Sequence, residues 1–234
     1  MTALSHFYRN QLLPSDQLAY DFLCEGIGRR QREIRTPPIQ EYARLVTAIN
    51  YDHPEFFYVN WLDAVQFRIG GGTEIMCPPY IYSGGDMEYI HRRICEIADE
   101  CPGISDRGKA QAVHDWFVRH ITYDQAGLQA TIRSPGMFSA AGPIIAGAAV
   151  CEGISKLACC LLRNLRVDCR LVTGLSAGGI PHAWISLLAD GELVYSDITY
   201  DMGLYTRGGE IPRRYFHISR TAMERDHIFW DKLR

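Results

Sequence analysis

The chain has 234 residues, of which 47% are hydrophobic, 22% charged and 11% aromatic. That much apolar side chain can bury a core large enough to offset the entropy of the chain, so an intrinsically disordered protein is excluded. The 24 Lys and Arg residues against 27 Asp and Glu residues leave a net charge of −3, which argues against a nucleic-acid partner because such partners select a basic surplus.

Signals for membranes and export are not visible in the sequence. No apolar run approaches the roughly 18 residues of a membrane-spanning helix. The first residues lack the basic stretch and following apolar stretch of a signal peptide. We therefore expect a cytoplasmic protein with no membrane partner.

The first half of the chain has apolar patterns that predict helices and strands with buried faces. Apolar residues at helical spacing predict a helix that begins at Ser15 or Asp16. The expected inner face of this helix consists of Leu18, Phe22, Leu23 and Ile27. A second helix is expected at 38–49, and alternating apolar residues predict strands at 57–61 and 64–69.

Two further helices precede the segment that carries the chemistry. Asp86 can cap the first of them, and Ser105 or Asp106 can begin the second. The apolar residues expected to face inward from the second helix are Ala110, Val113, Phe117 and Ile121. A loop of small residues at 134–150 then leads into a helix that begins at or near Cys151.

Two apolar runs, HAWISLL and ELVYSDI, flank the dipeptide Asp190-Gly191. Asp-Gly between alternating apolar residues is a strong signal for a tight hairpin. Pairing outward from this turn places Trp184 opposite Asp197 and His182 opposite Thr199. Side chains alternate along a strand, so we expect all four to project from one face, with the His182 imidazole within reach of the Asp197 carboxylate.

These residues can form a nucleophilic site. Cys151 at a helix start lies in the partial positive charge of the free N–H groups, which favours its thiolate. His182 can exchange protons with the thiol, and Asp197 can orient the imidazole. Gly153 keeps the first helical turn uncrowded, so that an extended substrate backbone could approach. Asp201 is the alternative partner for His182, since its position in the alternation also fits.

Three strings resemble the bacterial transglutaminase-like superfamily: AVCEGISKLACCLLRNLRVDCRLVTG, PHAWISLLADGELVYSDITYD and RYFHISRTAMERDH. The upstream pieces DHPEFFYV and VHDWFVRHITYD are similar to the lead-in of its bacterial members. The resemblance implies an α+β, papain-like core, with a nucleophile helix packed on an antiparallel sheet. It also implies Cys151 as nucleophile, His182 as base and Asp197 as orienting carboxylate. We expect an N-terminal helical and β extension at 1–105 and a catalytic domain at 106–234.

The sequence departs from that family in the loop before the nucleophile. Relatives often carry a tyrosine in a small-residue string like FSAAG, where this chain has Ala141. Ser139 could replace part of that role. Trp184 is expected to wall the cleft, and Glu152 could contact a substrate amine.

The expected activity is thiol-dependent acyl transfer on an amide, in the form of peptide or isopeptide hydrolysis on a peptide or protein substrate. Protein-glutamine transamidation or deamidation, or another amide acyl transfer, is one alternative. A binding module that has lost activity is the other. The chain has no C-x-x-C pair and no Cys/His cluster with zinc spacing, so we expect no metal and no cofactor.

Overall fold

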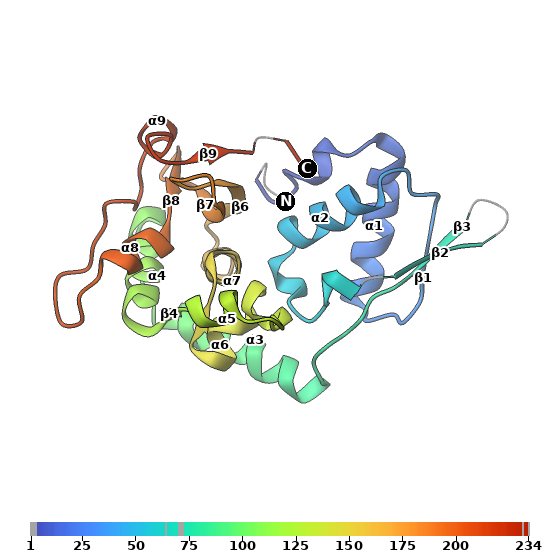
Figure 1. Cartoon of the computed structure of the whole chain (residues 1–234), viewed down its shortest axis with the longest axis horizontal. Coiled ribbons are helices and arrows are strands. Elements are labelled where there is room, and N and C mark those ends of the chain that lie inside the picture. The colour runs from blue at the N-terminus through green and yellow to red at the C-terminus, as the bar shows by residue number, and fades with distance from the viewer. Residues whose placement is uncertain (1–3, 64, 70–72, 231, 234) are drawn as a thin grey trace. The chain divides into compact units, whose positions relative to one another are not determined.

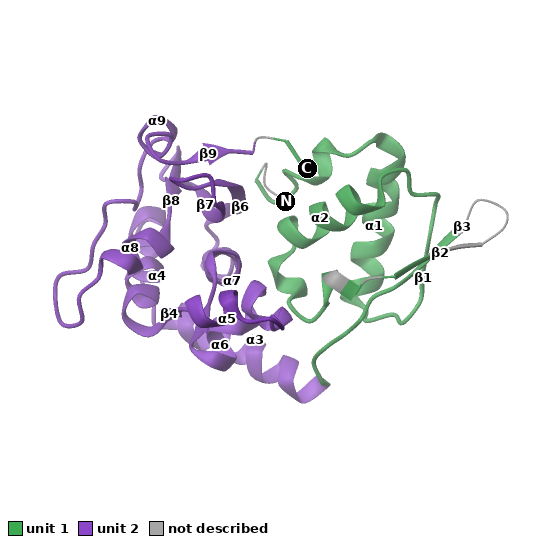
Figure 2. Ribbon diagram, in the orientation of Figure 1, with its two compact units in different colours: residues 1–83, 231–234 green, residues 84–230 purple. Residues whose placement is uncertain are grey.

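The computed structural model describes residues 4–63, 65–69, 73–230 and 232–233. The chain divides into two compact units (Figure 2). Unit 1 comprises residues 1–83 and 231–234, and unit 2 comprises residues 84–230. Among the described residues, no helix is both long and apolar enough to cross a membrane.

Unit 1 combines two helices with a small antiparallel sheet. The helices are α1 (Pro14–Gly28) and α2 (Tyr42–Asp52), with short 3₁₀ turns η1 (Arg9–Gln11), η2 (Pro54–Phe56) and η3 (Trp61–Asp63). The strands are β1 (Ile34–Thr36), β2 (Val65–Ile69) and β3 (Thr73–Cys77), in the order β1-β3-β2. The predicted strand at 57–61 is wrong. Phe57 and Tyr58 form a turn after η2, Val59 makes one isolated bridge to Tyr80, and Trp61 begins η3. Residue 64 of the other predicted strand lies outside the described part of the chain.

Helix α1 begins one residue earlier than expected and buries a different face. Pro14 occupies the first turn, where its missing N–H is no loss. Asp16 is fully buried and accepts hydrogen bonds from the backbone N–H groups of Gln40 and Glu41. Leu18 and Phe22 of the predicted inner face are exposed. The buried face is formed by Ala19, Tyr20, Leu23, Gly26 and Ile27.

Unit 2 is built from helices around a four-stranded antiparallel sheet (Figure 1). Its helices are α3 (Gly84–Asp99), α4 (Asp106–His120), α5 (Gln125–Gln129), α6 (Ala141–Ala146), α7 (Cys151–Asn164), α8 (Ile198–Leu204) and α9 (Arg220–Met223), with a 3₁₀ turn η4 (Pro135–Phe138). Its strands are β4 (Thr122–Tyr123), β5 (Ala148–Ala149), β6 (Asp168–Leu175), β7 (Pro181–Ala189), β8 (Glu192–Ser196) and β9 (Ile228–Phe229). The large sheet has the order β8-β7-β6-β9, and β4 pairs with β5 in parallel.

Helix α7 is the central element of unit 2. It packs against β6 and β7 of the sheet, and also against α3, α4 and α6. Every residue from Gly153 to Leu162 is buried, including the polar Ser155 and Lys156, because other elements surround the helix. The expected α+β class, with a nucleophile helix packed on an antiparallel sheet, is confirmed.

Several local expectations for unit 2 are also confirmed. Ser105 caps α4 by accepting a hydrogen bond from the backbone N–H of Gly108, at 3.1 Å. The predicted inward residues of this helix and its exit, Ala110, Val113, Phe117 and Ile121, are all buried. The loop at 134–150 is more ordered than expected, since it contains η4, α6 and β5.

The hairpin of β7 and β8 has the predicted register. Ala189 pairs with Glu192, and the ladder continues to Ile185 opposite Ser196. Asp190 and Gly191 both have positive φ, at 51° and 89°, as a type I′ turn requires. The strand ends sooner than expected, however, because the Asp197 side chain caps α8 and turns the chain into a helix.

The compact units divide between Ser83 and Gly84, whereas we expected a domain boundary between residues 105 and 106. Helix α3 lies between these two positions. It packs against α6 and α7, so it belongs to the same compact unit as the predicted site. The extent of the catalytic domain stays a prediction.

Candidate functional site

Cys151 is the first residue of α7, as the sequence predicts. The short strand β5 leads into it, and Val150 is the N-cap residue without a side-chain cap. The first-turn N–H groups of such a helix have no partners within the helix, and they carry the positive end of its dipole. Cys151 is partly exposed, and its place in the first turn sets it near the positive end of the helix dipole.

The structure brings His182 and Asp197 together. Nε2 of His182, on β7, donates a hydrogen bond to Oδ2 of Asp197 at 2.6 Å. The other oxygen of Asp197 accepts from the Thr199 hydroxyl at 2.6 Å and from the backbone N–H of Tyr200 at 3.1 Å. Asp197 is fully buried, yet both of its oxygens are satisfied by donors. Thr199 reaches the pair from the first turn of α8, and not from a strand as expected.

The electrostatics of the pair favour the charged forms of both groups. Burial by itself lowers the pKa of His182, but the negative charge and hydrogen bond of Asp197, together with the nearby Cys151 thiol, raise this pKa to about 10. Burial by itself raises the pKa of Asp197, but the charge of His182 and the hydrogen bonds from His182, His227 and Thr199 hold it well below its usual range. The Cys151 thiol is thus near enough to affect the pKa of His182, and Asp197 stays ionised.

Asp201 does not compete for His182. Its carboxylate accepts from the backbone N–H of Tyr215 and contacts Nε2 of His114 at 3.0 Å. Nδ1 of His114 contacts Asp115 at 3.2 Å, and His114 is buried. Asp201 thus ties α8 to α4, and Asp197 is the carboxylate beside His182.

Trp184 does not wall a cleft. It is fully buried in a cluster with Val172, Tyr195, Tyr215 and Met223. Its ring lies 5.9 Å from that of His182, with the two planes at 30°. The predicted alternation placed Trp184 correctly on the His182 face of β7, but neighbouring side chains cover Trp184 completely. Trp184 packs beneath the imidazole and has no surface to offer a substrate.

Gly153 makes room for the protein's own loop. A Cβ at this position would overlap the backbone carbonyl oxygen of Met137 and lie 3.0 Å from that of Ser139. Gly153 is also buried, so the expectation that it leaves space for a substrate backbone is wrong. The glycine allows η4 to pack closely on the first turn of α7.

The other predicted contact residues are engaged within the protein. The Ser139 hydroxyl donates to the Gly136 carbonyl and accepts from the backbone N–H of Ala141, so it holds the loop together. Glu152 accepts from the buried Lys156 ammonium at 2.7 Å, and Lys156 also donates to the Phe138 carbonyl at 3.0 Å. These contacts fasten the loop before Cys151 to α7.

Tyr123, on β4, is a site residue that our sequence reasoning missed. Burial, the nearby charge of Cys151 and a side-chain hydrogen bond with the thiol raise its pKa, and the Cys151 backbone N–H opposes this by hydrogen bonding to the phenol oxygen. The parallel pairing of β4 with β5 brings it there. The ITYD string directly after α4 was the available signal.

His227 is the second residue that was missed. Its Nε2 lies 2.9 Å from Oδ2 of Asp197, and its Nδ1 lies 2.7 Å from Oδ1 of Asp226. It is buried, with 2% of its surface exposed. No local pattern indicates these partners, because segments far apart in the sequence meet at Asp197.

One atom from each of His182, Asp197 and His227 could act as a metal ligand, since these atoms lie within 4.8 Å of one another. The two nitrogens, however, both contact the same carboxylate oxygen, at 2.6 Å and 2.9 Å. These are the distances of N–H···O hydrogen bonds, which leave no space between the atoms for an ion. We therefore assign the cluster to hydrogen bonding.

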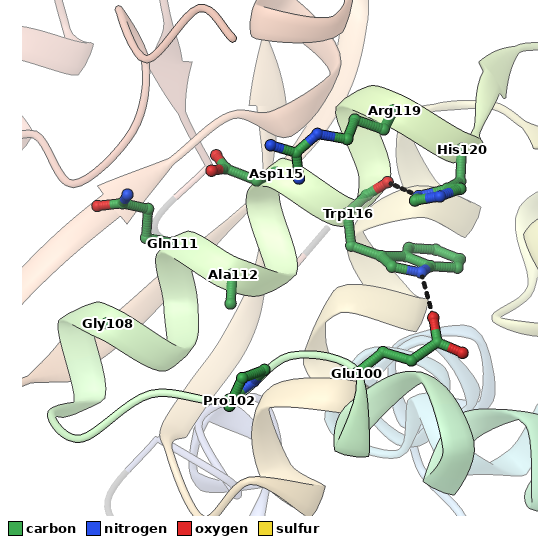
Figure 3. A pocket seen from close by; sticks show the side chains of 9 residues that line it. All are labelled: Glu100, Pro102, Gly108, Gln111, Ala112, Asp115, Trp116, Arg119 and His120. Carbon is green, nitrogen blue, oxygen red and sulfur yellow. Dashed lines mark hydrogen bonds between the residues drawn. The ribbon is translucent and has the colours of Figure 1, made fainter.

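A pocket of about 440 Å³ lies along the outer side of α4 (Figure 3). Trp116 forms part of its wall and donates from Nε1 to Glu100 at 3.2 Å. Nδ1 of His120 donates to the Trp116 carbonyl at 2.8 Å. The lining includes none of Cys151, His182 and Asp197, so this pocket is not the site described above.

The structure thus places a thiol at the start of a buried helix, a histidine on the adjoining strand β7, and an aspartate at the N-cap of α8. Residues 96–198 match the family model of the transglutaminase-like superfamily. The chain therefore contains a transglutaminase-like domain, as the resemblance implied. No curated protein matches the chain.

Solved structures with similar arrangements have low identity to this chain. A "TGase" crystal structure is 17% identical, with a TM-score of 0.41, over 77% of this chain and 53% of the other. A "putative cysteine protease" from Cytophaga hutchinsonii is 17% identical, with a TM-score of 0.38, over 58% of this chain and 61% of the other. A "putative protease" from Parabacteroides distasonis is 10% identical, with a TM-score of 0.34, over 57% and 35%. The match thus spans about half the length of the first of these proteins.

The close packing at Gly153 leads to a stability prediction. Gly153→Ala should lower the free energy of unfolding by about 1–3 kcal/mol, because the added methyl group must displace the backbone of the loop before Cys151. Urea denaturation measures the change. Gly203→Ala in α8 is the matched control, since a Cβ there meets nothing within 4 Å and alanine favours a helix by up to about 1 kcal/mol. Equal stability of the two variants would contradict the packing described here.

Proposed function

We propose that unit 2 is a thiol-dependent enzyme that transfers acyl groups from amide bonds, with Cys151 as nucleophile, His182 as base and Asp197 as orienting carboxylate. The proposed reaction is hydrolysis of a peptide or isopeptide bond. The observation that carries the proposal is the His182–Asp197 hydrogen bond of 2.6 Å, on an imidazole close enough to Cys151 for the thiol to affect its pKa.

The proposed reaction has two halves. His182 holds the proton of the Cys151 thiol on Nδ1, because Nε2 is hydrogen-bonded to Asp197, and the resulting thiolate attacks the amide carbonyl carbon. The carbon–nitrogen bond then breaks, and His182 gives its proton to the leaving amine. A water molecule attacks the resulting thioester, loses a proton to His182, and releases the acid as the thiol re-forms.

The negative charge that develops on the carbonyl oxygen during the attack must be stabilised by hydrogen-bond donors. The N–H groups at the start of α7 are one source, as in other sites at helix N-termini. The Tyr123 hydroxyl, which interacts with both the thiol and the backbone of Cys151, is the second. Tyr123 would then act where relatives use a tyrosine of the preceding loop.

The choice between water and an amine depends on what surrounds the thioester. A transamidase must exclude water while admitting an amine, which requires a closed channel. Trp184, the candidate wall, is buried beneath His182. The segment before Cys151 consists largely of small residues. This composition supports an open groove and hence hydrolysis.

The first test of the proposal is the covalent intermediate. Cys151→Ala should abolish turnover and leave the melting temperature nearly unchanged, because the side chain is partly exposed and only the sulfur is lost. Wild-type protein incubated with a peptide library should gain the mass of an acyl group, located on Cys151 by peptide mapping. Turnover by the alanine variant would rule out the covalent mechanism. A wild-type protein that never acquires an acyl group would instead support the inactive binding module.

The acceptor can be tested on the same substrates. With a primary amine present at millimolar concentration, we expect the free acid as the main product, because an open groove admits water at about 55 M. Mass spectrometry of the products separates the free acid from the amine adduct. A predominance of the adduct would favour transamidation.

Tyr123→Phe tests the second oxyanion donor. Loss of the hydroxyl should lower kcat by about 100-fold, the range found when one such donor is removed, with little change in KM. Thermal unfolding serves as the control for folding. A variant with wild-type kcat would show that the Tyr123 hydroxyl is not used in the reaction.

A further inference from the structure

His227 lies directly behind the proposed catalytic pair. His227 is the residue immediately before β9, and its side chain has no exposed surface. The two ring nitrogens face two carboxylates, Asp197 at 2.9 Å and Asp226 at 2.7 Å. Apart from these, the aromatic and titratable rings around it are His182, Trp184, Tyr200 and Tyr215, at centroid distances of 4.8–5.9 Å.

The two distances between the ring nitrogens and the carboxylate oxygens indicate which nitrogens of His227 carry a hydrogen. An ionised carboxylate can only accept hydrogen bonds, and a neutral imidazole has a hydrogen on only one nitrogen. A neutral His227 would therefore place a nitrogen lone pair against a carboxylate oxygen at one of its two contacts. Both contacts are hydrogen bonds only if both nitrogens carry hydrogen, so that the ring is a cation.

Asp226 is suited to hold such a cation. Its second oxygen accepts from the Tyr215 hydroxyl at 2.5 Å, and 26% of its side-chain surface is exposed. Its partial exposure lets water hydrate the carboxylate, which lowers the cost of placing a charge there. Asp226, His227, Asp197 and His182 then form a row of alternating charge that ends at Cys151.

We propose that His227 is a positioning residue of the site, a doubly protonated imidazole held between Asp226 and Asp197 that shares one oxygen of Asp197 with His182. This inference rests on the proposed function of Cys151, His182 and Asp197. Its consequence is that Asp197 divides its negative charge between two imidazoles. His182 then holds its proton less firmly than it would beside a carboxylate of its own, and it can return that proton to a leaving amine.

The experiment compares three proteins by nuclear magnetic resonance with isotope-labelled histidine: wild type, His227→Gln and His114→Gln. Glutamine at 227 keeps an N–H donor for Asp197 and removes the positive charge. In the wild type, both nitrogens of His227 should carry protons near neutral pH. In His227→Gln, deprotonation of His182 should occur about one pH unit higher than in the wild type, because Asp197 no longer shares its negative charge with a second cation.

A second NMR signal can be measured without strongly alkaline pH. The proton on Nε2 of His182 reports the strength of its bond to Asp197, and in His227→Gln this proton should move downfield near neutral pH. His114→Gln is the matched control, because His114 is also buried between two aspartates but does not contact Asp197. This control should leave the His182 signals unchanged while losing comparable stability.

Two results would overturn the inference: a wild-type His227 with only one protonated nitrogen, or His182 signals in His227→Gln that match those in His114→Gln. Failure of the proposed function gives a different result. If the Cys151 of wild-type protein is not alkylated by iodoacetamide at about pH 6, the thiol is not activated, whatever the state of His227. If Cys151 is alkylated there and His227 is neutral, only the inference about His227 fails.

Discussion

The buried charge of Asp197 is the constraint on which the site depends. A carboxylate without exposed surface is stable only if donors satisfy both of its oxygens, and here four donors do so. Each donor lies on or next to an element of the fold. His182 lies on β7, Thr199 and Tyr200 lie on α8, and His227 directly precedes β9. The same contacts that stabilise the charge therefore hold the imidazole of His182 in place beside Cys151.

Features governed by neighbouring residues could be predicted from the sequence. The Asp190-Gly191 turn determines the register of β7 and β8, and this register was predicted correctly as far as Ser196. The start of α7 at Cys151 followed from its apolar pattern. The prediction that Leu18 lies on the inner face of α1 was wrong. Two faces of this helix have similar apolarity, and tertiary packing determines which of them is buried.

The candidate site was only partly predictable for the same reason. Alternation along β7 placed Trp184 and His182 on one face, but a strand pattern does not reveal how deeply each residue on that face is covered. Tyr123 and His227 come from segments outside the hairpin and the nucleophile helix, and they arrive through the β4–β5 pairing and through β9. No local pattern connects them with Cys151. The close contact at Gly153 likewise depends on a loop that folds back on α7.

Activation of Cys151 by His182 is the central claim, and the pH dependence of its alkylation tests it most directly. With peptide mapping, iodoacetamide labelling can be followed separately at Cys151 and at Cys95, an exposed thiol that serves as internal reference. We predict that Cys151 is labelled rapidly already at about pH 6, because protonated His182 stabilises its thiolate. In His182→Ala, labelling of Cys151 should require a pH above about 8. A wild-type Cys151 that follows the profile of Cys95 would contradict the account.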